Sequence, residues 1–127
     1  MELPETLKYT ESHEWIADHG DGTVTVGITA VATEQLGDLV YVELPQVGAQ
    51  VTRGSNCAVV ESTKAAADVY APLTGEVVAA NAELSAHPER VNESPYGSGW
   101  LFKLKLADGA ELKSLLARDA YAKSAGV

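Results

Sequence analysis

The chain is built mostly from short apolar runs, each closed by glycine, proline or another turn-forming residue, and this pattern favours β-strands over long helices. Val24, Val26 and Ile28 alternate with small or polar residues, which predicts a strand with one buried face. Many short strands with regular turns predict a small, mainly β sandwich or barrel. The other apolar runs span 39–44, 57–60, 69–71, 77–78 and 100–106.

Two short helices are predicted between the strands. Residues 29–36 form the first, with Thr29 as its N-cap and Gly37 as its stop. Residues 81–86 predict one or two turns before Pro88.

The C-terminal segment, from about 109 to 127, has the strongest helical pattern. Asp108 is a suitable cap, and a second helix is expected around 118–123. The helix face is predicted from three leucines at i, i+3 and i+4, namely Leu112, Leu115 and Leu116.

Length and charge limit the classes of function. A chain of 127 residues fits one domain, expected to span residues 1–127. The net charge is −9, from 18 acidic and 9 basic residues. Such a surface repels phosphate backbones, which excludes nucleic acid as an expected partner and favours docking on basic patches of proteins. No apolar run approaches the roughly 20 residues that span a bilayer, so no membrane association is expected.

The first eight residues show neither a secretory signal nor the Arg-rich pattern of a transit peptide. We therefore expect a cytoplasmic location, with the mitochondrial matrix as the alternative for a trimmed precursor.

Cysteine and histidine do not predict a metal site. Cys57, the one cysteine, lies in an apolar run and is expected to be a buried, inert thiol. The three histidines, His13, His19 and His87, lack the H-x-x-x-H spacing of a zinc site, so no metal is expected.

The segment from Glu61 to Asp68 lies between two apolar runs of strand character. A loop of this length reverses the chain as a hairpin, which places Lys64 at or near its tip. An exposed hairpin lysine is usually a solubilising residue. It is also a suitable attachment point for a swinging group, since a modifying enzyme can reach its amine.

The surroundings of Lys64 resemble those of lipoyl and biotinyl carriers. Glu61 precedes the lysine by three positions, and the segment 71–77 reads APLTGEV. Biotinyl carriers usually have methionine on both sides of the lysine. The neighbours here are Thr63 and Ala65, which favours lipoate.

The whole chain resembles the H proteins of the glycine cleavage system, through five blocks in the family's order and spacing between about residues 3 and 116. The resemblance implies a mainly β fold, the flattened β-barrel (barrel-sandwich hybrid) of lipoyl and biotinyl carriers, with short helices and a C-terminal helix. The blocks are LKYTESHEW from Leu7, GIT from Gly27, LGDLVYVELPQVG from Leu36, ESTKAAADVYAPLTGEV from Glu61 and SPYGSGW from Ser94.

The resemblance implies a carrier in glycine catabolism and not an enzyme. Lipoate on Lys64 would take an aminomethyl group from the P protein, a pyridoxal-phosphate glycine decarboxylase. The T protein, a tetrahydrofolate-dependent aminomethyltransferase, would remove it, and the L protein, a dihydrolipoamide dehydrogenase, would reoxidise the arm. A lipoylating enzyme is a further implied partner, and the family implies a monomer.

The resemblance also implies a cleft for the loaded arm. The aminomethyl adduct is unstable in water, which is a chemical reason to bury it. The positions that match the family's cleft are Ser12, Glu14 and Asp68. Glu14 is expected to contact the amine, because a protonated amine attracts a carboxylate. Glu61 is expected to orient the modifying enzyme or the hairpin.

Three positions depart from the family's pattern. Thr63 stands where valine is frequent, and Ala67 stands where serine is usual. Arg90 occupies a position that is usually apolar. Ala67 is expected to remove one hydrogen bond near the arm, and Arg90 predicts a locally altered loop.

Three other functions compete with this one. An H-like protein can serve as a relay that passes lipoyl groups to other enzymes. An unmodified binding module can keep the same fold, although the intact hairpin argues against it. A Schiff-base enzyme using Lys64 is disfavoured, because such lysines need a desolvated pocket and this turn is expected to face solvent.

Overall fold

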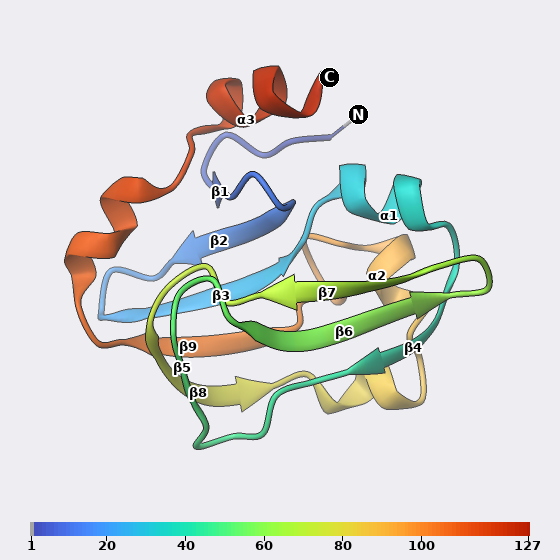
Figure 1. Cartoon of the computed structure of the whole chain (residues 1–127), viewed down its shortest axis with the longest axis horizontal. Coiled ribbons are helices and arrows are strands. Elements are labelled where there is room, and N and C mark those ends of the chain that lie inside the picture. Colours follow the sequence, from blue (N-terminus) through green and yellow to red (C-terminus); the bar gives the residue numbers. More distant parts are fainter. Residues whose placement is uncertain (1) are drawn as a thin grey trace.

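A computed structural model describes residues 2–127 as two antiparallel sheets with short helices around them (Figure 1). The mainly β prediction is confirmed. Within these residues the strand pairings form two separate sheets and not one closed ring, so the flattened barrel is open between its layers. The larger sheet has the order β1 (Lys8–Tyr9), β2 (Glu14–Asp18), β3 (Thr23–Ile28), β9 (Phe102–Leu106), β8 (Gly75–Ala80) and β5 (Gln50–Val51). The smaller sheet has the order β4 (Leu39–Glu43), β6 (Asn56–Ser62) and β7 (Ala66–Tyr70).

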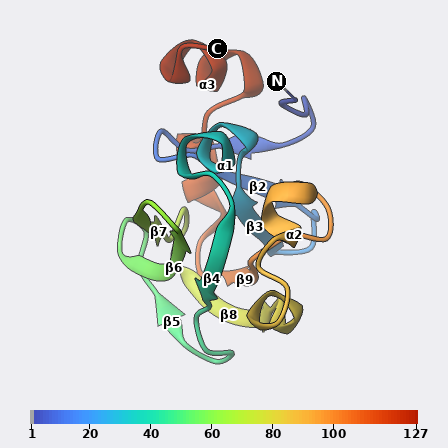
Figure 2. The ribbon, with the colours of Figure 1, turned by 90° about the vertical axis from the view of Figure 1, so that its right-hand side faces the viewer.

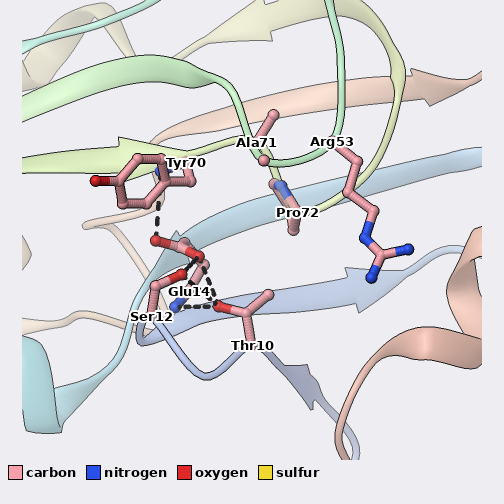
Figure 3. A pocket seen from close by; sticks show the side chains of 8 residues that line it. Thr10, Ser12, Glu14, Arg53, Tyr70, Ala71 and Pro72 are labelled. Atoms are coloured by element: carbon pink, nitrogen blue, oxygen red, sulfur yellow. Dashed lines mark hydrogen bonds between the residues drawn. The ribbon is translucent and has the colours of Figure 1, made fainter.

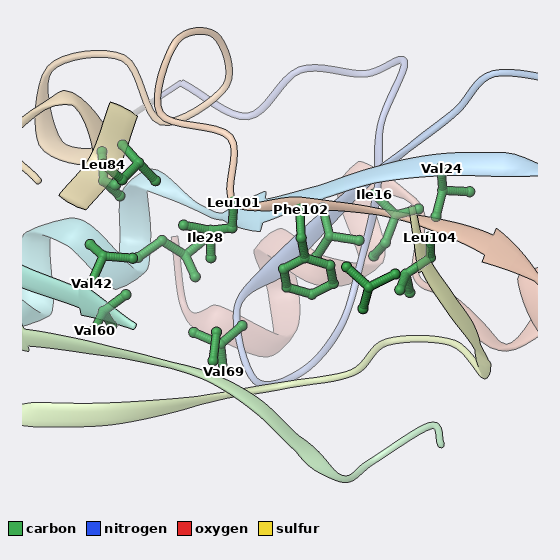
Figure 4. Packing of buried hydrophobic residues seen from close by; sticks show 14 of the residues in the cluster. Ile16, Val24, Ile28, Val42, Val60, Val69, Leu84, Leu101, Phe102 and Leu104 are labelled. Atoms are coloured by element: carbon green, nitrogen blue, oxygen red, sulfur yellow. The ribbon is translucent and has the colours of Figure 1, made fainter. Parts of the chain in front are cut away.

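The main hydrophobic core lies between the two sheets (Figure 4). Every second side chain of a strand points to this side, and those positions are mostly branched aliphatic residues that pack well on a pleated surface. The larger sheet contributes Ile16, Val24, Val26, Ile28, Val77, Phe102 and Leu104, and the smaller sheet contributes Leu39, Val42, Ala58, Val60 and Val69.

The opposite face of β3 is also covered, which corrects the prediction of one buried face. Thr25 is buried, and the indole of Trp15 lies against Gly27 on the neighbouring strand. Trp15 belongs to a second cluster that includes Tyr9 and Tyr121, two rings stacked with their centroids 4.7 Å apart. The sequence pattern did not reveal this layer, because its parts are distant in the sequence: the Trp15 indole donates to the Pro95 carbonyl at 2.9 Å, and Tyr121 comes from α3, which lies beside the N-terminal segment (Figure 2).

The predicted helix at 29–36 is confirmed as α1 (Ala30–Leu36). The Thr29 hydroxyl oxygen accepts from the N–H of Ala32 at 3.4 Å, and Gly37 ends the helix with a φ of +81°. The predicted turns at 81–86 are confirmed as the 3₁₀ helix η1 (Ala82–Ser85).

The altered loop predicted at Arg90 is instead a helical turn, α2 (Arg90–Glu93). Arg90 lies 3.6 Å from Glu83 in an exposed ion pair, so its side chain is accommodated at the surface. No helix within residues 2–127 is long and apolar enough to cross a membrane.

The C-terminal segment is helical, but its elements differ from the prediction. Asp108 caps a 3₁₀ helix, η2 (Gly109–Ser114), by accepting from the N–H of Ala110 at 2.9 Å. Leu112 and Leu115 are three residues apart, which matches the period of a 3₁₀ helix. Leu116 leaves the helical path and exchanges two backbone hydrogen bonds with Tyr9. The regular helix is α3 (Arg118–Ala125).

Gly27 is predicted to be essential for the packing of Trp15 on β3. A Cβ at this position would lie 2.6 Å from three indole atoms, closer than carbon atoms approach one another. Gly27→Ala should therefore lower the free energy of unfolding by about 2 kcal/mol, as overpacking does. Urea unfolding followed by tryptophan fluorescence measures this difference.

Gly109→Ala is the matched control, because a Cβ there meets no atom within 4 Å. We expect a change below about 0.5 kcal/mol for this variant. Equal losses in the two variants would contradict the role assigned to Gly27.

Candidate functional site

Lys64 lies at the tip of the β6–β7 hairpin, as the sequence predicts (Figure 1). Glu61 and Ala66 form the last cross-strand pair before the turn. The N–H of Ser62 donates to the carbonyl of Ala65 at 2.7 Å, and the Ser62 hydroxyl oxygen accepts from the N–H groups of Lys64 and Ala65 at 3.3 and 3.1 Å. Since Lys64 is exposed, its amine is accessible to a modifying enzyme.

The stem of Lys64 lies over the C-terminal end of α1. A Cβ added to Gly37 would be 3.6 Å from Cε of the lysine. The side chain of Asn92 fixes this part of the backbone, because it accepts from the N–H of Leu39 and donates to the carbonyl of Gly37, each at 2.9 Å. The end of the lysine side chain therefore lies beside a helix end that Asn92 holds in place.

A narrow cavity of about 110 Å³ lies between α1, β2 and the β6–β7 hairpin. It includes Leu36, the residue before Gly37, so it begins close to the stem of Lys64. Its apolar lining consists of Ile28, Ala32, Leu36, Val60, Ala67 and Val69, and its polar lining consists of Ser12, His13, Glu14, Gln35 and Asp68.

Glu14 is a buried carboxylate in the lining of this cavity, with 1% of its surface exposed. Its Oε1 accepts from the hydroxyls of Thr10 and Ser12, each at 2.6 Å, and its Oε2 accepts from the N–H of Tyr70 at 3.4 Å (Figure 3). The N–H of Glu14 donates to the Thr10 hydroxyl oxygen at 3.0 Å. Three donors thus hold the carboxylate in one orientation.

Burial raises the pKa of the Glu14 carboxyl above its ordinary value, and the hydrogen bonds from Ser12, Thr10 and Tyr70 oppose this rise. No cation neutralises Glu14 in a salt bridge among the residues that the structure describes. A desolvated carboxylate with donors but no counterion favours the binding of a cationic group.

Glu14 and Ser12 also face a second, more open cavity of about 340 Å³ (Figure 3). Its other walls come from Thr10, which follows β1, from Arg53 and Gly54, and from residues 70–72 at the end of β7. Ser12 and Glu14 therefore line both cavities.

The structure brings together three of the four residues that the sequence singles out around Lys64. Ser12, Glu14 and Asp68 line the same narrow cavity. Asp68 is exposed on the edge strand β7, whereas Glu14 is buried on β2. Glu61 is half-buried on β6 and does not line the cavity, so the structure separates it from the other three.

Two other residues take positions that the sequence only partly anticipates. Ala67 lines the narrow cavity and offers it a methyl group where the family usually has a hydroxyl. Cys57 is half-buried, and its Sγ lies 3.5 Å from the Val69 carbonyl oxygen. Burial raises the pKa of this thiol to about 12, with a smaller contribution from Glu14, so it is protonated at neutral pH as expected for an inert cysteine.

Thr10 and Ser62 are site residues that the sequence analysis missed. Thr10 orients Glu14, and Ser62 shapes the turn that presents Lys64. Serine at the start of a tight turn is a recognisable signal, because its hydroxyl commonly bonds backbone N–H groups two or three residues later. Thr10 lacks such a local signal, since its partner is defined by the strand geometry.

His13 has a left-handed backbone, with a φ of +74°. This conformation costs a non-glycine residue about 1 kcal/mol or more, so surrounding contacts must hold it. The Nδ1 of His13 lies 2.7 Å from the hydroxyl of Tyr121, and its carbonyl accepts from the N–H of Thr29 at 3.0 Å. Burial lowers the pKa of this imidazole, which favours the neutral form.

Comparisons with known proteins agree with this geometry. The model of the glycine cleavage H-protein family matches residues 7–126. A glycine cleavage system H protein of Laribacter hongkongensis (strain HLHK9) is 56% identical over 124 residues and covers 98% of both chains. One from Escherichia coli O45:K1 is 56% identical over 119 residues, which are 94% of this chain and 92% of that protein. The crystal structure of a glycine cleavage system H protein from Mycobacterium marinum has a TM-score of 0.89 and 42% identity, over 98% of this chain and 100% of the other. The chain therefore belongs to the glycine cleavage H-protein family.

Proposed function

We propose that Lys64 holds lipoate as an amide and that the loaded arm rests in the narrow cavity against Glu14. Membership of the H-protein family makes the chain a lipoyl carrier of glycine cleavage and not an enzyme. One observation supports the choice of Lys64 above all. Its exposed side chain leaves a hairpin tip and reaches the end of α1 with its Cε, next to a cavity whose lining includes the buried carboxylate of Glu14.

The residues around the cavity fit the chemistry of this group. When bound, lipoate supplies a disulfide that opens to accept an aminomethyl group and is re-formed by oxidation. Its hydrocarbon chain is apolar, as are Leu36, Val60 and Val69 on the cavity wall. These side chains would exclude water from the cargo. The aminomethyl adduct is unstable in water, so burial would protect it.

Glu14 is the proposed partner of the amine on that cargo. An ammonium beside a buried carboxylate makes a charge-assisted hydrogen bond, which is stronger than a bond between neutral groups. Ser12 already bonds Glu14, and Asp68 lies farther along the wall at the exposed edge of β7. We therefore assign Glu14 to the amine, Ser12 to the orientation of Glu14, and Asp68 to the outer part of the cleft.

The proposed partners are the P, T and L proteins of glycine cleavage and a lipoylating enzyme. Glu61, half-buried near the end of β6, is a proposed recognition element for the lipoylating enzyme. We propose a monomeric carrier unit that spans the whole chain. The relatives from Laribacter and Escherichia are bacterial proteins, which favours the cytoplasm as its place of action.

Lys64→Arg should abolish lipoylation, since arginine keeps the positive charge but offers no amine that forms the amide. Co-expression with a lipoylating enzyme, followed by intact-mass measurement, should show one added lipoyl group on the parent chain and none on the variant. Peptide mapping should locate the parent's modification between Glu61 and Asp68.

Lys113→Arg is the control, because Lys113 is exposed but lies in η2, away from the hairpin. This variant should gain one lipoyl group, as the parent does. A lipoyl group that persists in Lys64→Arg would refute the assignment of Lys64.

Glu14→Gln should stabilise the fold while it weakens the cleft. A carboxyl whose pKa is raised in the folded state binds protons more tightly there than in the unfolded chain, so its ionisation opposes folding. The variant should therefore unfold at a higher temperature than the parent at pH 7, and the gap should close as the pH falls below the ordinary value of 4.5. Thermal unfolding across this pH range measures the difference.

In the lipoylated and loaded protein, Glu14→Gln should shorten the lifetime of the aminomethyl cargo by about tenfold, the effect of one charge-assisted hydrogen bond. Release of ammonia and formaldehyde measures this lifetime. Glu11→Gln, an exposed neighbour, should change neither quantity. A Glu14→Gln protein with the parent's cargo lifetime would contradict the proposed role of Glu14.

A further inference from the structure

The hydroxyl of Tyr121 lies at a junction between two segments far apart in the sequence. It is 2.7 Å from Nδ1 of His13, which follows β1, and 2.8 Å from Oγ1 of Thr29, which caps α1. Tyr121 itself is fully buried and belongs to α3, near the C-terminus. One phenolic group therefore connects the C-terminal helix to both segments.

Both segments contribute to the lining of the narrow cavity. The turn at 12–14 contributes Ser12 and Glu14, and α1 contributes Ala32 and Leu36. Thr29 also donates its N–H to the carbonyl of His13 at 3.0 Å, so the turn and the helix start are bonded through both backbone and side chain. A shift of either segment would change the width of the cavity at Glu14.

The backbone of His13 is left-handed, so the contact with Tyr121 affects the conformation of the turn. Such a conformation is disfavoured for histidine and persists only where its surroundings hold it. A relaxed turn would move Glu14, the next residue, away from the Thr10 hydroxyl that now bonds both its N–H and its carboxylate. The contact between Tyr121 and His13 opposes that relaxation.

We propose that Tyr121 is a positioning residue for the carrier cleft. Its hydroxyl holds the left-handed turn at His13 against the N-cap of α1, and so fixes Glu14 where the cargo amine would bind. The inference rests on the proposed function of Glu14, and it extends the site to a helix more than one hundred residues away in the sequence.

The ring and the hydroxyl of Tyr121 have separable roles. The ring stacks on Tyr9 at 4.7 Å with an interplanar angle of 10°, a contact that phenylalanine retains. Tyr121→Phe therefore removes the hydrogen bonds to His13 and Thr29 while it keeps the ring packed on Tyr9. Tyr9→Phe is the matched control. Tyr9 is equally buried in the same cluster, and its hydroxyl donates to the Pro4 carbonyl at 2.6 Å and not to His13 or Thr29.

The first measurement uses amide hydrogen exchange, followed by NMR, on the unlipoylated chain. Tyr121→Phe should speed the exchange of the Thr29 and Glu14 amides by about fivefold, the effect of one lost hydrogen bond. The Val77 amide, which donates to the Ala49 carbonyl at 2.9 Å in another part of the fold, should not respond. Tyr9→Phe should leave the Thr29 and Glu14 amides unchanged.

The second measurement is the lifetime of the aminomethyl cargo on lipoylated protein. Tyr121→Phe should shorten it by about fivefold in the parent background. The same substitution should have no further effect in the Glu14→Gln background, because it acts through the placement of Glu14.

Three results would each overturn the inference. The Thr29 and Glu14 amides of Tyr121→Phe could exchange at the parent's rate, or the Val77 amide could be accelerated as much as they are. Tyr121→Phe could also shorten the cargo lifetime as strongly in the Glu14→Gln background as in the parent. A normal cargo lifetime in Glu14→Gln alone would refute the proposed role of Glu14 instead. The exchange data would then still decide whether Tyr121 holds the turn.

Discussion

The buried carboxylate of Glu14 lies where the two sheets approach each other, and the candidate site is arranged around it. Glu14 belongs to β2 of the larger sheet, and its Oε2 accepts from the N–H of Tyr70 on β7 of the smaller sheet. Thr10 and Ser12 satisfy the other oxygen. A charged group in the interior is tolerated only when its hydrogen bonds are made, so the turn at 10–13 and the edge of β7 must keep their relative positions.

This arrangement links the stability of the protein to its proposed task. The raised pKa of Glu14 means that the fold is less stable with the carboxylate ionised than it would be with a neutral isostere. A cation that docks beside Glu14 would relieve part of that penalty, whereas a neutral arm would not. The proposed cleft would thereby distinguish an arm that bears an amine from one that does not, while the exposed hairpin tip leaves Lys64 accessible.

Local patterns predicted the parts of this molecule that depend on neighbouring residues. The helix at 29–36 and the hairpin around Lys64 follow from caps, turns and strand periodicity, and both are confirmed in position. The C-terminal segment was less predictable, because Leu116 bonds the distant Tyr9 and leaves the helical path. The contacts of Tyr121 could not be predicted at all, since its partners are brought to it by the tertiary fold and have no fixed spacing in the sequence.

The most direct test of the account is to map where the loaded arm rests. Amide chemical shifts of the lipoylated protein would be compared between the oxidised arm and the aminomethyl-loaded arm. If the cargo rests against Glu14, the changes will concentrate at Ser12, Glu14, Ala32 and Val69, around the narrow cavity between α1 and the hairpin. Changes confined to the hairpin tip around Lys64 would contradict this placement, because they would show that the cargo stays in solvent.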